Sequence, residues 1–390
     1  MQIRRYYLDK LIKYIDTEFV KLITGVRRSG KSFILKMLEK HLQQLNKKTI
    51  YLNFEHPDTF SIQTADKLYE FIKTQVETDE RIYFLFDEIA EVDNWQKLIN
   101  GLRIAFNCDI YLTGSNAKML SGELATYLSG RYVEIKVYPL SLVELKDFTE
   151  ADSIDQYLQE YIKYGGFPSV AFTKDEQMKS DILKGIYNSI LLKDVSIRGN
   201  ITQIDVLMKL SLYLLDNIGK SVSSSKISNY FKSMNQVVKP ETINKYLQLL
   251  ENAFIFYKAT RYDIRGKEHL KTLGKYYVVD LGLKNIMLGR MNSNLGSMIE
   301  NVVYLKLIND GWHVFVGKYD DLEIDFVCFK DDYTKYVQVT LSMPINSTRE
   351  TDNLLVVKDN YERIIVTYDY KDVGVIDGIK IVHLTTFLAS

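Results

Sequence analysis

The stretch that decides the fold is Gly25-Val26-Arg27-Arg28-Ser29-Gly30-Lys31-Ser32. It fits G-x-x-x-x-G-K-[ST], a loop whose backbone N–H groups surround phosphate oxygens. The apolar run Val20–Thr24 predicts a buried strand before it, and residues Phe33–Gln44 predict a helix after it. In this order, the turn and the helix N-terminus converge on a phosphate. All eight residues are therefore nucleotide-binding candidates, with the Lys31 charge near the β- and γ-phosphates and the Ser32 hydroxyl placed to hold Mg²⁺.

A second motif indicates hydrolysis rather than binding alone. Residues Arg81–Glu88 form an apolar run that ends in two carboxylates. We expect Asp87, at the end of a strand, to hold the Mg²⁺ shell through water. Glu88 would polarise the attacking water, since a general base must lie within one hydrogen bond of the nucleophile. The alternative is an ordinary strand that stops at a solvated acidic turn.

A third strand is predicted over Asp109–Asn116, again with polar residues at its carboxyl end. Ligands of open α/β sheets bind at that edge. Ser115, or Asn116 in its place, is therefore a candidate sensor of the γ-phosphate.

An arginine precedes the next strand. A helix is predicted over Ala117–Leu128, and Arg131 lies between it and a strand over Tyr132–Val137. Arg131 could reach the nucleotide of a neighbouring subunit. Alternatively it is a cation that complements the dipole at the helix C-terminus.

These residues resemble an AAA+ ATPase core. More narrowly, the chain resembles a bacterial and archaeal group that joins such a core to a C-terminal DUF4143 region. The resemblance rests on the loop and on four further stretches: Leu112–Asn116, Gly130-Arg131, Tyr138–Ser141 and Gly165–Pro168. It implies that ATP and Mg²⁺ are bound by Lys31, Ser32, Asp87 and Glu88, that Ser115 is a sensor, and that Arg131 is an arginine finger.

Composition is that of an ordinary folded protein. The 390 residues are 46% hydrophobic and 26% charged, and fifty basic residues cancel fifty acidic ones. Any nucleic-acid site must therefore be a local patch. Two cysteines, Cys108 and Cys328, show no metal or disulfide spacing. Neither a signal peptide nor a membrane-spanning run is visible, so we expect a cytoplasmic protein without a membrane partner.

Four domains are predicted. An AAA+ nucleotide-binding core with a parallel sheet covers residues 1–138, and a helical lid covers 139–201. A winged helix-turn-helix covers 202–288, and an α/β restriction-endonuclease-like domain, similar to PD-(D/E)XK nucleases, covers 289–390.

The winged helix is predicted from three helical segments followed by two strands. The helices are expected over Ile204–Ile218, 221–231 and Pro240–Asn252, and the strands over Phe254–Thr260 and Tyr276–Val279. The Ser-rich start of the second helix offers N-caps.

Charge makes this region a candidate for DNA binding. Residues Gly219–Tyr276 carry nine Lys and two Arg against four acidic residues, a net charge of +7. Such a patch suits phosphate contacts. The alternative is a solvated face of a domain that packs on its own core or on a protein. The expected DNA contacts are Lys239, Lys245, Arg261 and Arg265.

The last domain departs from the nuclease pattern that it resembles. Glu300 on a helix over 295–309 and Asp325 on a strand are candidate metal ligands. On the next strand Gln338 stands in place of an acid and Thr340 in place of the lysine. A neutral amide is a poor Mg²⁺ ligand. We therefore expect a nuclease-like fold that has lost cleavage.

Together these features predict Mg²⁺-dependent ATP hydrolysis coupled to DNA binding or remodelling, in a homo-oligomer. Two alternatives stay open. One is a nucleotide-switched regulator that acts on a protein partner, and the other is an ATP-dependent DNA nuclease.

Overall fold

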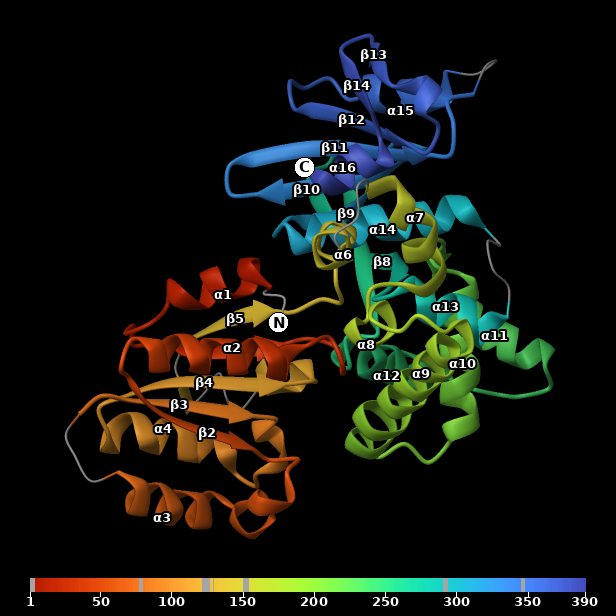
Figure 1. Ribbon diagram of the computed structural model, residues 1–390. Coiled ribbons are helices and arrows are strands. Elements are labelled where there is room, and N and C mark those ends of the chain that lie inside the picture. Colours follow the sequence, from red (N-terminus) through yellow and green to blue (C-terminus); the bar gives the residue numbers. More distant parts are fainter. Residues whose placement is uncertain are drawn as a thin grey trace. The chain divides into compact units, whose positions relative to one another are not determined.

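The phosphate-binding motif lies in a five-stranded sheet of the computed structural model (Figure 1). The strands are β1 (Val20–Thr24), β2 (Lys48–Asn53), β3 (Ile82–Asp87), β4 (Cys108–Gly114) and β5 (Tyr132–Lys136). Their order is β2-β3-β4-β1-β5, and every neighbouring pair is parallel. All five carboxyl ends therefore meet at one edge. Every residue of β1 and β3 is buried, as expected for strands covered on both faces.

The structure describes residues 4–76, 80–120, 127–128, 130–149, 154–289, 294–344 and 348–390. The chain divides into an N-terminal unit, Met1–Pro139 with Asn252–Phe254, and a C-terminal unit, Leu140–Glu251 with Ile255–Ser390. No helix in the described ranges is both long enough and apolar enough to span a bilayer.

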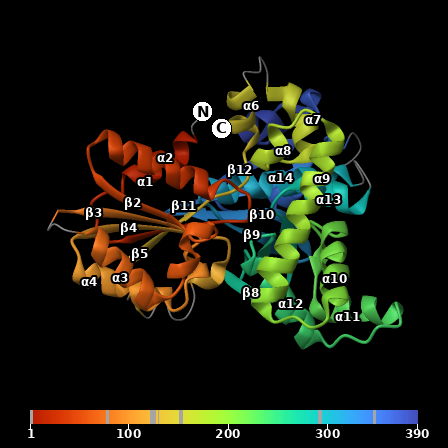
Figure 2. The same ribbon diagram turned by 60° about the horizontal axis from the view of Figure 1, so that its bottom comes forward.

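Helices cover both faces of the N-terminal sheet. They are α1 (Arg5–Ile12), α2 (Lys31–Gln44), α3 (Ala65–Gln75) and α4 (Trp95–Ala105), with 3₁₀ segments η1 (Pro57–Ile62), η2 (Ile89–Glu91) and η3 (Ala117–Leu120). Figures 1 and 2 show α1 and α2 on one face and α3 and α4 on the other. The helix expected over Ala117–Leu128 begins as the 3₁₀ segment η3, and its middle, residues 121–126, lies outside the described residues.

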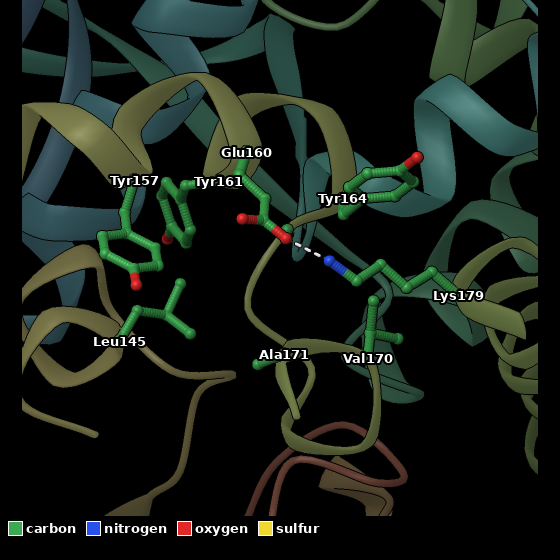
Figure 3. Close-up of a pocket in the computed structure, with 9 residues that line it drawn as sticks. Leu145, Tyr157, Glu160, Tyr161, Tyr164, Val170, Ala171 and Lys179 are labelled. Atoms are coloured by element: carbon green, nitrogen blue, oxygen red, sulfur yellow. Dashed lines mark hydrogen bonds and ion pairs between the residues drawn. The ribbon is translucent and has the colours of Figure 1, made fainter. Parts of the chain in front are cut away.

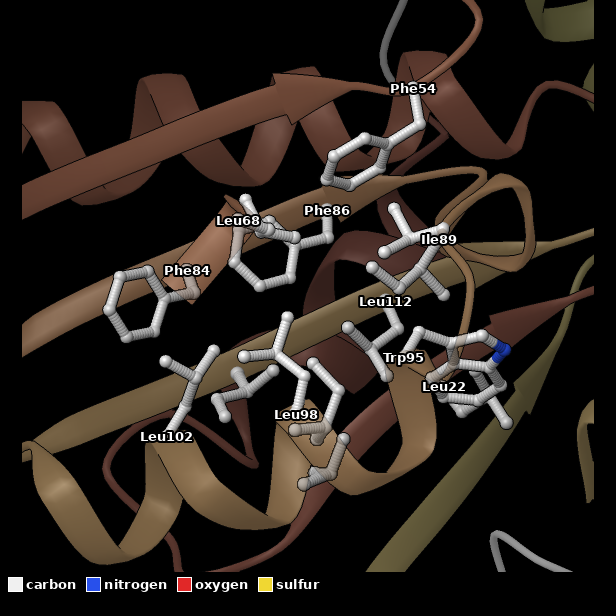
Figure 4. Packing of buried hydrophobic residues seen from close by; sticks show 14 of the residues in the cluster. Leu22, Phe54, Leu68, Phe84, Phe86, Ile89, Trp95, Leu98, Leu102 and Leu112 are labelled. Atoms are coloured by element: carbon white, nitrogen blue, oxygen red, sulfur yellow. The ribbon is translucent and has the colours of Figure 1, made fainter. Parts of the chain in front are cut away.

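Successive side chains of β3 point to opposite faces of the sheet and so pack in two separate apolar clusters. Phe84 and Phe86 point to the side of α3 and α4, where they pack with Leu98 and other apolar residues (Figure 4). Tyr83 and Leu85 point to the side of α1 and α2. This two-sided burial fixes the register of β3 and so the place of the carboxylates that follow it.

The C-terminal unit contains most of the helices. They are α6 (Leu142–Thr149), α7 (Ile154–Tyr164), α8 (Pro168–Ala171), α9 (Glu176–Ser189), the π-helical η4 (Ile190–Ile197), α10 (Ile204–Asp216), α11 (Ser224–Ser233), α12 (Pro240–Asn252), α13 (Leu281–Leu288), α14 (Leu295–Asn309), α15 (Arg349–Leu355), η5 (Tyr370–Asp372) and α16 (Leu384–Ala389). The expected helices over 240–252 and 295–309 are confirmed. So is the serine N-cap of α11, where the Ser223 hydroxyl accepts a hydrogen bond from the Lys226 N–H at 3.2 Å.

The Gly165–Pro168 stretch has a structural reason. The Asp280 carboxylate accepts hydrogen bonds from the backbone N–H of Gly166 (2.7 Å) and of Gly282 (2.8 Å). A Cβ on Gly165 would lie 1.8 Å from Asp280 Oδ1, and the φ of Gly165 is +74°, so glycine is required there. Burial raises the pKa of Asp280 to about 7, and the backbone donors oppose this rise.

A small cavity lies beside this turn, between α6, α7, α8 and α9 (Figure 3). Three tyrosines of α7 line it, and Glu160 of the same helix forms an ion pair with Lys179 of α9. Its volume of about 20 Å³ is enough for a water molecule, not for a cofactor.

Nine strands form the second sheet. They are β6 (Ser221–Val222), β7 (Phe256–Asp263), β8 (Glu268–Val278), β9 (His313–Tyr319), β10 (Leu322–Lys330), β11 (Tyr333–Thr340), β12 (Glu362–Thr367), β13 (Gly374–Ile376) and β14 (Ile379–His383). Their order is β13-β14-β12-β11-β10-β9-β7-β8-β6. The strands expected around residues 254–260 and 276–279 pair as the β7–β8 hairpin. That hairpin also pairs with β9, so one sheet crosses the domain boundary expected at residues 288/289.

Helices α14 and α15 cover opposite faces of this sheet. On β10, Phe326 packs against Tyr304 of α14, with ring centroids 5.9 Å apart. The next residue, Val327, packs in a cluster with Leu354 of α15. Because α15 has only seven residues, it covers part of its face.

Candidate functional site

The phosphate-binding loop connects β1 to α2 at the carboxyl edge of the N-terminal sheet. Gly25 (φ +143°) and Gly30 (φ +99°) adopt conformations that favour glycine. A Cβ on Gly25 would lie 2.1 Å from the carbonyl oxygen of Val137, so the loop passes close to the chain that follows β5. Gly30 is the N-cap of α2, whose first residue is Lys31. The N-terminus of α2 therefore directly follows the loop, which is the arrangement that anion binding uses.

The side chain of Lys31 turns back from the start of α2 to the first residues of the loop. Its ammonium donates hydrogen bonds to the carbonyl oxygens of Gly25 (3.0 Å) and Val26 (3.1 Å). It also lies 3.8 Å from Oε1 of Glu88. The side chain is buried, so the charge acts in a region of low dielectric, where it is strong.

Asp87, at the end of β3, is held by four donors. Its Oδ1 accepts from the hydroxyls of Ser32 (3.0 Å) and Thr113 (2.6 Å), and its Oδ2 accepts from Tyr51 (3.0 Å) and the Asn53 amide (3.2 Å). Ser32 and Asp87, which were each predicted to hold Mg²⁺, thus lie within hydrogen-bond distance of each other. A hydroxyl and a carboxylate oxygen are ligands that suit Mg²⁺, so these two residues fit the predicted cation.

Glu88 is buried in an unusual conformation. Its φ is +53°, and its backbone N–H donates to the Thr113 hydroxyl at 2.8 Å. Oε2 is buried and makes no hydrogen bond with any residue that the structure describes. Burial raises the pKa of Glu88, while the charges of Lys31 and Arg27 lower it. A buried carboxylate with one unpaired oxygen beside a phosphate loop is poised to accept a proton.

The residues after β4 lie at the same edge. Ser115 and Asn116 are both buried. Thr113 in β4 donates a hydrogen bond to Asp87 and accepts one from the Glu88 backbone N–H. Thr113 was not predicted as a site residue, although it lies only two residues before the predicted sensor.

Arg131 lies at the opposite edge of the sheet. β5 runs parallel to β1, with Val20 opposite Tyr132 and Thr24 opposite Lys136. The loop follows Thr24, whereas Arg131 precedes Tyr132, so four residue steps of strand, roughly 13 Å, separate the two ends. Arg131 is exposed. It therefore does not reach the phosphate loop of its own subunit.

Arg4 supports the loop from a distant part of the sequence. Its guanidinium donates to the carbonyl oxygens of Ser29 (2.8 Å) and Tyr138 (3.0 Å). It is buried, and its Cζ lies 4.5 Å from the centroid of the Tyr7 ring. No motif marks this arginine, because its role depends on contacts with residues 25 and 134 positions away in the chain.

A second cluster of charges lies in the C-terminal unit, around an unpredicted lysine. Lys275 Nζ on β8 lies 2.9 Å from Glu300 of α14, 3.0 Å from Glu323 and 3.4 Å from Asp325, both of β10. Tyr277 donates a hydrogen bond to Glu300 at 2.7 Å. Burial disfavours the charge of Lys275, but the three carboxylates raise the pKa of Lys275 above its ordinary value. The ammonium is therefore the cation of this cluster.

The metal predicted for Glu300 and Asp325 does not fit this arrangement. Lys275 lies between those carboxylates, at the position that a shared cation would need. Gln338 accepts a hydrogen bond from the Asp325 N–H (3.2 Å) and donates one to Glu350 (2.9 Å), so its amide links groups instead of binding metal. Among the described residues, no group of three or more His, Cys, Asp and Glu side chains is suited to hold a metal ion.

The four predicted DNA contacts fall on different elements. Lys239 and Lys245, just before and within α12, are exposed. Arg265 in the β7–β8 turn is exposed and pairs with Asp320 at 2.8 Å. Arg261 in β7 is only 19% exposed and lies 3.8 Å from Glu323. Arg261 is thus less available to a phosphate than the sequence suggested, because it faces the carboxylate cluster.

Comparisons with known proteins agree with the geometry of the N-terminal unit. Residues 17–146 match the model of an AAA domain, and residues 155–294 match a domain of unknown function, DUF8612. An uncharacterized protein of Haemophilus influenzae is 47% identical over 393 residues, which cover 99% of this chain and 98% of that protein. One of Methanocaldococcus jannaschii is 30% identical over 407 residues, covering 97% and 89%. The chain belongs to the family of these two proteins.

The fold of this family is also seen in a solved structure. A Walker-type ATPase of Pyrococcus abyssi has a TM-score of 0.51 and 16% identity, and the match covers 74% of this chain and 96% of that one. At this identity the likeness concerns the fold alone. With the AAA match, it confirms the predicted AAA+ core of the family member described here. The predicted DUF4143 region is not found, since residues 155–294 match DUF8612 instead.

Proposed function

We propose that the protein hydrolyses ATP with Mg²⁺ and that its ATP cycle is coupled to DNA binding or remodelling in a homo-oligomer. The observation that carries the ATPase part is the convergence of Lys31, Ser32, Asp87 and Glu88 at one edge of the sheet. These four residues come from two separate motifs, and each motif contacts the other: Lys31 lies 3.8 Å from Glu88, and Ser32 donates a hydrogen bond to Asp87 at 3.0 Å.

Each of these residues has a distinct task in the proposed reaction. Lys31 attracts the β- and γ-phosphates, and Ser32 and Asp87 hold Mg²⁺, which neutralises phosphate charge when bound. Glu88 accepts a proton from the attacking water. The oxygen of that water then bonds to the γ-phosphorus, and the bond between the γ-phosphorus and the oxygen of the ADP leaving group breaks. Thr113 keeps Asp87 and Glu88 in place by contacting both. Ser115 remains our candidate for sensing the γ-phosphate.

Assembly is proposed from the position of Arg131. It lies at the sheet edge away from its own phosphate loop. An exposed arginine there can contribute to hydrolysis only across a subunit interface, as arginine fingers supplied in trans do. The proposal therefore needs at least two copies of the chain.

The DNA part rests on the order of elements from α10 to β8. A helix, a short strand, two helices and a hairpin follow one another, and β6 pairs with β8 at the edge of the hairpin. This order supports a winged helix-turn-helix. The exposed lysines at α12, Lys239 and Lys245, are the proposed phosphate contacts. Cleavage is not proposed, because the ammonium of Lys275 on β8 lies where a metal shared by Glu300 and Asp325 would be needed.

ATP turnover measured with single-stranded, duplex and branched DNA, at low and high salt, tests the coupling. We expect stimulation that falls with salt, because lysine–phosphate contacts release counterions. Replacing Lys239 and Lys245 with Glu reverses their charges and should weaken the stimulation by DNA of any sequence. The same replacement at the exposed Lys371 should leave the stimulation unchanged. An ATP turnover rate that none of the three DNA forms changes at low salt would contradict the coupling. It would favour the alternative, a nucleotide-switched regulator that acts on a protein partner.

A further inference from the structure

The C-terminal unit contains a cavity of about 640 Å³ that the ATPase mechanism does not use. It lies on the α15 face of the nine-stranded sheet, where the apolar cluster around Leu354 ends. Its walls come from β7 and the turn after it, the end of β9, strands β10 and β11, and the loop before β12. Its volume falls within the roughly 300–1,000 Å³ that is typical of sites for small organic ligands.

Aromatic rings form much of the wall. Five of the thirteen lining residues are aromatic: Tyr262, Tyr319, Phe329, Tyr336 and Tyr361. Tyr262 and Phe329 meet edge to face, with centroids 5.1 Å apart, and Tyr361 lies 6.3 Å from Tyr336. Tyr361 is 49% exposed, so part of its ring is open to a planar partner.

The rim is positively charged. Arg265, Lys267 and Lys358 line the cavity and are exposed, against one acidic lining residue, Asp359. The carboxylate of Asp359 is turned to protein donors, since it accepts from the Tyr336 hydroxyl at 2.7 Å and the Tyr361 N–H at 3.2 Å. Arg265 pairs with Asp320 at the surface, an interaction weak enough for a phosphate to replace.

We infer that this cavity binds single-stranded nucleic acid, with a base stacked on Tyr361 and backbone phosphates beside Lys267 and Lys358. Aromatic faces within a cationic groove are the chemistry by which proteins hold unpaired bases without reading their sequence. Duplex DNA does not fit, because its bases are already stacked. The inference rests on the proposed role in DNA binding and names the form of DNA bound.

Fluorescence anisotropy tests the site in the full chain. The probe is a labelled oligothymidylate of about 16 nucleotides, the upper end of the site size of OB folds that bind single strands. Tyr361→Ala should weaken binding roughly 5- to 150-fold, the cost of losing one stacked base. The double reversal Lys267→Glu with Lys358→Glu should flatten the salt dependence by about 1.4 units, since each single-strand phosphate contact contributes about 0.7. Tyr333→Ala, on a 73% exposed tyrosine outside the cavity, is the matched control.

The outcomes separate this site from the proposed function. A wild type that binds no DNA overturns both. A wild type that binds the oligonucleotide, with Tyr361→Ala no weaker than Tyr333→Ala, overturns the site and leaves DNA binding at α12 standing. Stacking on an unpaired base would also be contradicted if wild type bound the corresponding duplex as tightly as the single strand and Tyr361→Ala weakened both to the same extent. Thermal melting of each variant shows whether a loss reflects unfolding.

Discussion

Glu88→Gln is the change that isolates the proposed chemical step. The amide has the shape of the carboxylate but cannot accept the proton of the attacking water. Lys31, which we assign to phosphate binding, keeps its hydrogen bonds to the carbonyls of Gly25 and Val26. We therefore expect the variant to bind ATP with Mg²⁺ and to lose hydrolysis.

The size of the loss follows from the role of the carboxylate. A positioned general base contributes roughly 10²–10⁴-fold to a rate. This corresponds to about 3–5 kcal/mol of transition-state stabilisation. The Coulomb attraction between Glu88 and Lys31 at 3.8 Å also disappears, so ATP affinity should stay equal or rise, since Lys31 then has one anion fewer beside it.

The same change also alters how the stability of the folded protein depends on pH. Burial raises the pKa of Glu88 above its ordinary value of 4.5, so the folded protein binds this proton more tightly than the unfolded chain does. Deprotonation therefore disfavours the folded state increasingly as pH rises above 4.5. The stability of wild type relative to Glu88→Gln should be highest below pH 4.5, should decline as the pH rises through the raised pKa of the folded state, and should stay level above it.

The assay combines phosphate release with binding of a fluorescent ATP analogue. Glu70→Gln makes the same chemical change on an exposed residue of α3, whose side chain pairs only with Lys73 among the described contacts, and should keep full turnover. Equal turnover by wild type and Glu88→Gln would refute the assignment of the base. Loss of analogue binding in Glu88→Gln would refute the separation of binding from chemistry.

Three further predictions concern assembly and the C-terminal unit. Arg131→Ala should bind ATP and hydrolyse it poorly, and mixing it with Glu88→Gln protein should restore part of the activity at hybrid interfaces; a monomer with full turnover at high dilution would rule this out. Lys275→Met should lower the free energy of unfolding by up to about 3–5 kcal/mol in urea titrations, because it leaves the largely buried carboxylates of Glu300 and Asp325 without their cation; a variant as stable as wild type would show that the cluster is not held by this charge. The natural protein should not cut plasmid DNA with Mg²⁺, with or without ATP, and robust metal-dependent cutting would prove this wrong.

Local motifs made the nucleotide site predictable. Lys31 and Ser32 belong to a contiguous loop motif, and Asp87 and Glu88 end an apolar run that predicted a buried strand. The contacts of Tyr51 and Asn53 with Asp87 were not predicted, because they depend on β2 lying next to β3 in register. Such pairing across the sheet leaves no signature in a single sequence.

The C-terminal unit shows where sequence reasoning stops. The helix with Glu300 and the strand with Asp325 were predicted at their places, yet Lys275 was assigned only to a basic patch. Its role as a counterion depends on the order of strands in the folded sheet. β7 lies between β8 and β9, and this order brings Lys275 of β8 next to Glu300 of α14. A charge that serves as an internal counterion and one that serves a ligand look alike in sequence, and burial alone separates them.

The central claim is Mg²⁺-dependent ATP hydrolysis that requires Lys31. Its most direct test is the rate of phosphate release from ATP by wild type and by Lys31→Ala, measured with Mg²⁺ and again with a chelator. The account predicts steady hydrolysis by wild type that the chelator abolishes, and neither ATP binding nor hydrolysis by Lys31→Ala. Hydrolysis that survives both the chelator and the loss of Lys31 would contradict it.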